Sequence, residues 1–96
     1  MSKVYWVSVY KSVSDLDALA AYAKLATPAM LAGGGKFMAR GEPVKIIESG
    51  MQQRVVLIEF ESLEKAVATY NSEGYQAALK ALGSGAERDI RIVPAN

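Results

Sequence analysis

Residues 54–60 read RVVLIEF, and this segment carries the strongest strand signal in the sequence. Its β-branched and aromatic side chains favour a pleated surface that is packed against other elements. Alternation along a strand places Glu59 on the same side as Val55 and Leu57, and the other four residues on the opposite side. The segment therefore predicts a strand with an ionisable side chain among apolar neighbours.

Further strand segments lie on both sides of this run. Residues 36–40 and 44–49 are predicted as strands, with a turn at 41–43 and a hairpin loop at 50–53 that leads into the central run. Residues 3–10, KVYWVSVY, predict the first strand, and residues 90–93 the last. Nearly every position of the first strand is apolar, so we expect both of its faces to be covered.

Two helical regions alternate with these strands. Ser14 is the predicted N-cap of the first helix, because small and apolar residues recur at helical spacing after it. Pro28 is expected to kink or interrupt this helix, and the three glycines at 33–35 are expected to end it. Ser62 is the predicted N-cap of the second helix, which is expected to break at residues 71–74 and resume over 75–82.

The resulting order is β-α-β-β-α-β. We predict a ferredoxin-like α+β sandwich, with an antiparallel sheet, helices on one face, and a single domain over residues 1–96. In the first strand, Trp6 and Ser8 project to one side and Tyr5 and Val7 to the other. Both sides are too apolar for water, and two helices cover only one. We therefore expect the second face to pair with another copy of the chain in a homodimer.

Composition excludes several classes of chemistry. Eleven basic and ten acidic residues leave a formal net charge of +1, which gives no reason to expect a nucleic acid or a membrane surface as partner. The chain has no cysteine and no histidine. Disulfides, thiolate nucleophiles, and the commonest general base and metal ligand are thus missing, and we expect neither a metal nor a cofactor. No targeting signal is visible, which favours the cytoplasm.

Several segments spread along the chain resemble the domain-of-unknown-function 1330 family. They are Tyr22-Ala23, Pro28-Ala29, Gly34-Gly35-Lys36-Phe37, Arg40-Gly41, Glu48, residues 54–60 and residues 70–76. The resemblance implies membership of the dimeric α/β-barrel superfamily, whose subunits are ferredoxin-like and whose sheets face each other across a dimer. Other members of that superfamily include small oxygenases, isomerases and dechlorinating or dehydrating enzymes.

Glu59 is the leading candidate for chemistry. An ionised carboxylate inside an apolar strand is costly unless it is paired or protonated. One interpretation is a carboxyl group with a raised pKa that transfers protons. The other is a structural ion pair with Arg40 or Lys45 on a neighbouring strand.

Two arginines and several aromatic residues suggest a ligand site. Arg40 and Arg54 have the guanidinium geometry that holds an anion bidentately, although each is also explained as a solvated charge at a strand end. Trp6, Tyr22 and Tyr75 are explained either as core aromatics or as the lining of an apolar pocket.

Three functional hypotheses follow. The first is a homodimeric protein that binds a small organic molecule, aromatic molecules included, in an apolar cavity. The second is a cofactor-independent enzyme in which Glu59 is the acid/base and Arg40 or Arg54 holds an anion. The third is a structural assembly module without a cavity large enough for a ligand.

Overall fold

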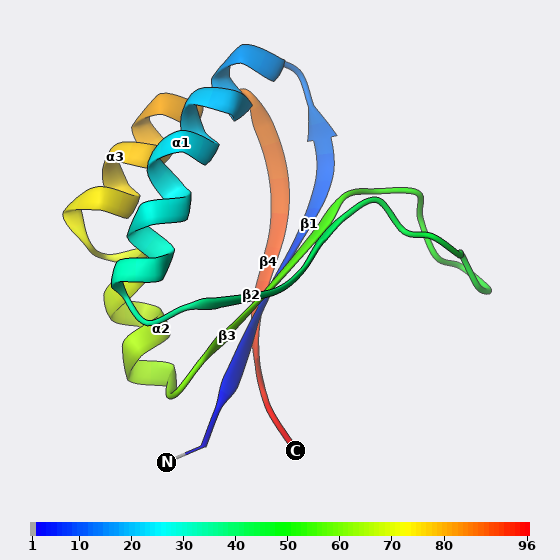
Figure 1. Cartoon of the computed structure of the whole chain (residues 1–96). Helices are drawn as coiled ribbons and strands as arrows, with labels where there is room; N and C mark the ends of the chain where they lie inside the picture. Colours follow the sequence, from blue (N-terminus) through cyan, green and yellow to red (C-terminus); the bar gives the residue numbers. More distant parts are fainter. Residues whose placement is uncertain (1) are drawn as a thin grey trace.

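The computed structural model describes residues 2–96 as a four-stranded sheet with three helices on one face (Figure 1). The predicted β-α-β-β-α-β order is confirmed, with the second helical region divided into two helices. The elements are β1 (Val4–Val13), α1 (Leu16–Ala32), β2 (Lys36–Gly41), β3 (Val55–Phe60), α2 (Leu63–Tyr70), α3 (Glu73–Leu82) and β4 (Ala86–Pro94).

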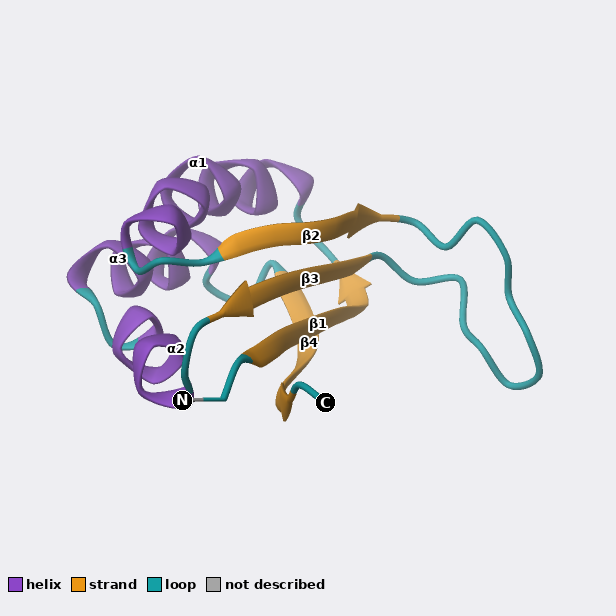
Figure 2. Cartoon of the chain, turned by 60° about the horizontal axis from the view of Figure 1, so that its bottom comes forward, coloured by secondary structure: helices purple, strands orange, loops and turns teal. Residues whose placement is uncertain are grey.

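The strands are ordered β2-β3-β1-β4 across the sheet, and every neighbouring pair is antiparallel (Figure 2). This is the ferredoxin-like topology, and the predicted α+β class is confirmed. On β1 and β3, Trp6 pairs with Ile58 and Ser8 with Val56 on the face beneath the helices. Val7 pairs with Leu57 on the opposite, open face. The predicted alternation along both strands is therefore confirmed.

An aromatic cluster fills the space between the sheet and the helices. Trp6 and Tyr75 meet edge to face with 5.6 Å between ring centroids, and the Phe60 ring is tilted against Trp6 with 6.2 Å between centroids. Trp6, Phe60 and Tyr75 are among the largest fully buried side chains of the protein. Such edge-to-face contacts add to the free energy gained by burying the rings. The cluster fixes the distance between β1 and α3.

Helix α1 differs from expectation at two positions. Its N-cap is Asp15, not Ser14, because the Asp15 carboxylate accepts a hydrogen bond of 3.0 Å from the amide of Ala18. The Ser14 hydroxyl instead donates to the carbonyl of Ser84. The predicted interruption at Pro28 is wrong, since the helix continues to Ala32. Pro28 is exposed, so the backbone carbonyl that it leaves without a partner is on the solvent side.

The second helical region breaks over fewer residues than predicted. Ser62 caps α2 as expected, with its hydroxyl accepting from the amide of Lys65 at 3.2 Å. Asn71 and Ser72 alone separate α2 from α3, because Ser72 is itself an N-cap and starts the new helix at Glu73. Within residues 2–96, no helix has the length and apolarity needed to cross a membrane.

The predicted strand over residues 44–49 is wrong. Residues 42–54 form an extended loop that leaves the sheet between β2 and β3 (Figure 2). Pro43 removes a backbone donor and Glu48 has a positive φ of 53°, so neither fits a regular ladder. The first and last strands of the chain are longer than predicted, with β1 reaching Val13 and β4 beginning at Ala86.

Candidate functional site

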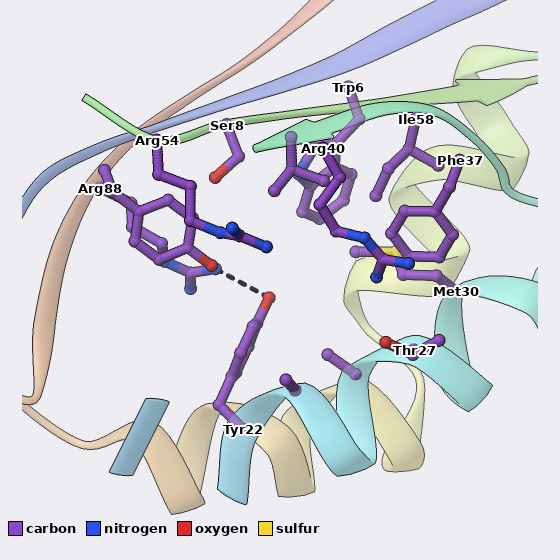
Figure 3. Close-up of a pocket in the computed structure, with 14 residues that line it drawn as sticks. Trp6, Ser8, Tyr22, Thr27, Met30, Phe37, Arg40, Arg54, Ile58 and Arg88 are labelled. Atoms are coloured by element: carbon purple, nitrogen blue, oxygen red, sulfur yellow. Dashed lines mark hydrogen bonds between the residues drawn. The ribbon is translucent and has the colours of Figure 1, made fainter. Parts of the chain in front are cut away.

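A cavity lies between α1 and the sheet face that α1 covers (Figure 3). Its volume of about 60 Å³ has room for roughly four water molecules or a comparably small organic molecule. The walls are mostly apolar or aromatic, and three arginines reach into the space. The lining residues are Trp6, Ser8, Tyr10, Tyr22, Ala23, Ala26, Thr27, Met30, Phe37, Arg40, Arg54, Val56, Ile58 and Arg88.

Alternate residues of strand β1 line the sheet side of the cavity. Trp6, Ser8 and Tyr10 all project toward the helices because side chains alternate with period two along a strand. Ser8 is only 3% exposed, and its hydroxyl has no hydrogen-bond partner in the part of the chain that the structure describes. In Figure 3 this hydroxyl points into the cavity. A buried hydroxyl without a protein partner is rare and is available to a ligand.

A β-bulge in β2 directs Arg40 into the cavity. Phe37 pairs with Ile58 and Arg40 with Val56, and the register shifts between residues 37 and 39. Two residues three positions apart face opposite sides of a regular strand, but the extra residue places Phe37 and Arg40 on the same side. The guanidinium carbon of Arg40 then lies 4.4 Å from the Phe37 ring centroid. This cation–π contact holds the exposed Arg40 side chain at the mouth of the cavity.

Arg54 and Arg88 reach the other end of the cavity (Figure 3). Arg54 lies just before β3, where its carbonyl accepts a 2.9 Å hydrogen bond from the amide of Tyr10. Arg88 lies opposite Tyr10 on β4, next to a second register shift between residues 10 and 12 of β1. Its guanidinium carbon lies 4.6 Å from the ring centroid of Tyr22. Both arginines are half-buried.

Tyr22, Tyr75 and Arg88 form a buried polar network. The two phenol oxygens are 2.7 Å apart, and Nη1 of Arg88 donates to Tyr22 at 2.7 Å and to Tyr75 at 3.4 Å. Burial, with a smaller contribution from Tyr75, raises the pKa of the Tyr22 phenol well above its ordinary value, although Arg88 opposes the shift. Tyr22 is therefore protonated at neutral pH, and it is a hydrogen-bond donor and not a base.

The direction of the tyrosine hydrogen bond follows from the surroundings of each hydroxyl. Tyr75 is fully buried, and within residues 2–96 its phenol oxygen is hydrogen-bonded only to Tyr22 and Arg88. Because Arg88 has no acceptor atom, the Tyr75 proton must be donated to Tyr22. The Tyr22 proton is then free to point into the cavity, which Tyr22 lines. Tyr75 thus positions Tyr22 as a donor to a bound molecule.

The charge of the lining has one sign. No acidic side chain is among the fourteen lining residues, and three of them are arginines. Within residues 2–96, the carboxylates that lie within 4.0 Å of a lysine or arginine nitrogen pair with Lys3, Lys65 and Arg91, none of which lines the cavity. Unpaired guanidinium groups at an apolar cavity can bind the acidic group of an organic molecule.

The predicted site residues divide into two groups. Trp6, Tyr22, Arg40 and Arg54 line the cavity, and Tyr75 lies directly behind Tyr22. Glu59 is on the open face of the sheet, outside the cavity. Its partner is Lys3, with 3.4 Å between Nζ and Oε1, and not the predicted Arg40 or Lys45.

Sequence reasoning missed three residues of the site. Arg88 was overlooked because the last strand was expected to begin at Ile90. Ser8 was placed on the correct face, but nothing in the sequence marks its hydroxyl as unpaired. Phe37 was recognised as part of a family-like segment, yet its place beside Arg40 depends on the β-bulge.

Comparison with known proteins identifies the family. The family model described as "Domain of unknown function (DUF1330)" matches residues 3–96. No protein of curated function matches the chain.

Solved structures share the fold at low sequence identity. A protein of unknown function from Rhodopseudomonas palustris is 16% identical and aligns with a TM-score of 0.81 over 99% of this chain and 83% of its own. SnoaB, described as a cofactor-independent oxygenase from Streptomyces nogalater, is 12% identical, with a TM-score of 0.71 over 100% and 95% of the two chains. A dimeric protein of unknown function and ferredoxin-like fold from Bacteroides fragilis is 13% identical, with a TM-score of 0.58 over 99% and 98%. At these identities the likeness concerns the fold alone.

Proposed function

The chain belongs to the DUF1330 family, and from that premise and the geometry of the cavity we propose that it binds a small organic anion between the sheet and α1. The observation that carries the proposal is the set of three arginines, without carboxylate partners within residues 2–96, around a cavity whose walls are mostly apolar or aromatic. The acidic group of the ligand contacts guanidinium groups, and its apolar body contacts Trp6 and its neighbours.

Electrostatics support an anion over a neutral ligand. Arg54 and Arg88 are half-buried without a carboxylate partner within residues 2–96, and like charges around one cavity repel each other. An entering anion lowers this repulsion and receives charge-assisted hydrogen bonds, which are stronger than those between neutral groups. The Tyr22 hydroxyl adds a neutral donor on the helix side. The volume of about 60 Å³ is less than half of the roughly 150 Å³ that encloses a benzene ring, so the acidic group of an aromatic ligand lies inside the cavity and its ring extends to the mouth beside Arg40.

Benzoate and benzamide form a matched pair of probes for this proposal, because they differ in charge and hardly in size. Trp6 is the single tryptophan and lines the cavity, so its fluorescence reports binding, and calorimetry gives the affinity. We expect benzoate to bind and benzamide to bind at least tenfold more weakly. Arg54→Gln should weaken benzoate binding by about tenfold, the loss expected for one charge-assisted contact.

Lys24→Gln is the matched control, since it removes one positive charge from the exposed side of α1. It should leave benzoate binding unchanged. Equal binding of the two probes, or equal loss in both variants, would contradict the proposed anion site.

Native mass spectrometry of gently purified protein is the first measurement, because a bound small molecule adds a mass that disappears on denaturation.

The enzyme hypothesis that assigns acid/base chemistry to Glu59 is not part of this proposal. Glu59 projects from the open face of the sheet, whereas the cavity lies on the face that the helices cover. A ligand in the cavity therefore cannot contact the Glu59 carboxylate of the same chain. Among the lining residues, none is a carboxylate and the phenol of Tyr22 is protonated, so the cavity is suited to binding.

We further propose that the open sheet face pairs with a second copy of the chain. Tyr5, Val7, Val9, Val55 and Leu57 lie on this face and are half-buried in the single chain. A contiguous apolar surface of this kind marks an association site. The Bacteroides fragilis neighbour is described as dimeric, which supports a homodimer here. Homodimerisation is compatible with ligand binding, because the cavity lies on the other side of the sheet.

A further inference from the structure

We infer that the ligand is an organic diacid, with one acidic group held by Arg54 and Arg88 and the other by Arg40. This inference rests on the proposed anion site and specifies the class of molecule that the site accepts. It is carried by the positions of the three arginines and by the contact that holds Arg40 away from the other two.

The arginines enter the cavity from opposite edges of the sheet. Arg40 belongs to edge strand β2 and Arg88 to edge strand β4, with β3 and β1 between them. Neighbouring strands are about 4.8 Å apart, so the two edge backbones are separated by roughly 14 Å. In Figure 3 the side chains of Arg54 and Arg88 lie together at one end of the cavity, and Arg40 lies at the other end. The geometry gives two separate positions for an acidic group, and the three arginines do not surround a single position.

Phe37 keeps the second position separate. The Arg40 guanidinium is stacked 4.4 Å from the Phe37 ring centroid, on the side of the cavity away from Arg54. Within the described residues, no carboxylate lies within salt-bridge distance of Arg40. A planar guanidinium held over a ring presents its N–H groups at the edge in the geometry that matches a carboxylate. Arg40 is exposed at the mouth, so the second acidic group can remain partly hydrated.

Ser8 supplies a neutral contact at the first of the two positions. Its hydroxyl is nine-tenths or more buried, lacks a partner within residues 2–96, and in Figure 3 points into the cavity on the side of Arg54. An acidic group held by Arg54 and Arg88 therefore lies on the same side of the cavity as this hydroxyl. A buried polar group of this kind gains most from a ligand that offers it an acceptor, because it otherwise remains without a hydrogen bond.

Charge balance favours two acidic groups over one. A monoanion bound at Arg54 and Arg88 leaves Arg40 unpaired at the mouth, whereas a diacid places opposite charges at both ends. The phenols of Tyr22 and Tyr75 occupy only Nη1 of Arg88, so its other N–H groups remain available to the first acidic group.

Terephthalate, isophthalate and benzoate test this inference, since all three present the same ring with two acidic groups or one. Affinities are measured by calorimetry and by Trp6 fluorescence at low and at high salt. We expect at least one of the diacids to bind about tenfold more tightly than benzoate at low salt. The gain should shrink at high salt, because Arg40 is exposed and its charge is screened.

Variants of Arg40 test whether this residue causes the tighter binding of the diacids. Arg40→Gln should lower the affinity for the diacids to that for benzoate, with a much smaller loss for benzoate itself, whereas Arg40→Lys, which keeps the charge but not the planar guanidinium, should retain only part of the preference. Lys24→Gln should change neither affinity. Circular dichroism establishes that each variant is folded before affinities are compared.

The outcomes separate the two proposals. If benzoate binds and neither diacid binds more tightly, the diacid inference is wrong and the anion site stands. A diacid preference that survives Arg40→Gln also overturns the inference, because the second group then lies elsewhere. If none of the three anions binds, both the anion site and the diacid inference are wrong.

Discussion

Removing the buried Ser8 hydroxyl tests whether it stabilises the fold or binds a ligand. It makes no hydrogen bond to the described chain, so replacing it with alanine removes no native contact. We expect Ser8→Ala to keep the melting temperature unchanged or to raise it by up to about 4–8 °C, the shift that corresponds to 1 kcal/mol in a domain of this size. The same variant should weaken benzoate binding.

Thermal unfolding followed by circular dichroism, with and without benzoate, tests this expectation. A lower melting temperature without ligand would mean that the hydroxyl has a partner in the free protein. Val56→Ala, at the pairing partner of Ser8, is the contrasting variant because it removes buried apolar contacts. That variant should lower the melting temperature.

Tyr22 predicts how stability depends on alkaline pH. Its pKa is raised in the folded protein by burial, with Tyr75 adding to the shift and Arg88 opposing it. Above about pH 10, the ordinary phenol pKa, the unfolded chain releases this proton while the folded chain retains it. The unfolded state then binds fewer protons, so the free energy of unfolding falls as pH rises above 10. Below pH 10 this group produces no slope.

Absorbance at 295 nm follows the ionisation of the five tyrosines. Tyr22→Phe should leave the absorbance change of the folded protein unaltered, because Tyr22 does not ionise before unfolding. It should also reduce the alkaline loss of stability in urea titrations between pH 9 and 11. A smaller absorbance change in the folded variant would show that Tyr22 ionises in the native state.

At the scale of the elements, close approach of two helices depends on a glycine. A Cβ added at Gly33 would lie 1.9 Å from Oγ1 and 2.8 Å from Cβ of Thr69 in α2. Thr69 is buried, and its hydroxyl donates a 2.8 Å hydrogen bond to the carbonyl of Lys65. We expect Gly33→Ala to force the helices apart and cost about 1–3 kcal/mol, the usual range for overpacking.

Urea unfolding of Gly33→Ala measures this cost. Adding Thr69→Ala should recover part of the loss, since it removes the atom nearest to the new methyl group, and the two changes should therefore not be additive. Gly34 has φ of 90° but open space around its Cβ position, so Gly34→Ala serves as the comparison for backbone strain alone. If the double variant is no more stable than the sum of the single changes predicts, the helix contact is not the cause.

The strands also show which features of the fold could be predicted from the sequence. Period-two alternation in residues 4–10 and 54–60 placed Trp6 beneath the helices and Glu59 on the open face, because a strand leaves each side chain only two directions. The β-branched residues of 44–49 suggested a strand that does not form. Composition reports a preference for a pleated surface, but a strand also needs a partner and a compatible backbone. Pro43 and Glu48 do not provide that backbone.

The candidate site could be predicted only in part, for a related reason. Trp6, Tyr22, Arg40 and Arg54 were named from residue type, yet two β-bulges and contacts between distant residues bring the site together. Tyr22 and Tyr75 are 53 positions apart in the chain and share a hydrogen bond. No local pattern encodes such a pairing. The shift in register that turns Arg40 into the cavity is likewise a property of the β2–β3 pair, not of β2 alone.

At the scale of the whole molecule, the two faces of the sheet present different surfaces. One face holds the cavity, and the other presents apolar side chains around the pair Val7 and Leu57. If this open face binds a second copy, the ammonium group of a lysine at its centre must be desolvated, which is unfavourable even though Glu59 lies on the same face. We therefore expect Leu57→Lys to convert the dimer into a monomer while the chain remains folded.

Native mass spectrometry and light scattering report the change from a mass near twice 10.3 kDa to a mass near 10.3 kDa. Leu25→Lys is the matched control, because Leu25 is an exposed leucine of α1, on the helical side of the molecule. It should remain dimeric.

A monomeric wild-type protein would contradict pairing through the open face. A Leu57→Lys protein that is still dimeric would place the interface elsewhere. The next surface to alter would then be the loop over 42–54, which has exposed apolar residues, among them Val44 and Ile47. Benzoate binding should persist in monomeric Leu57→Lys, because every residue assigned to the cavity belongs to a single chain.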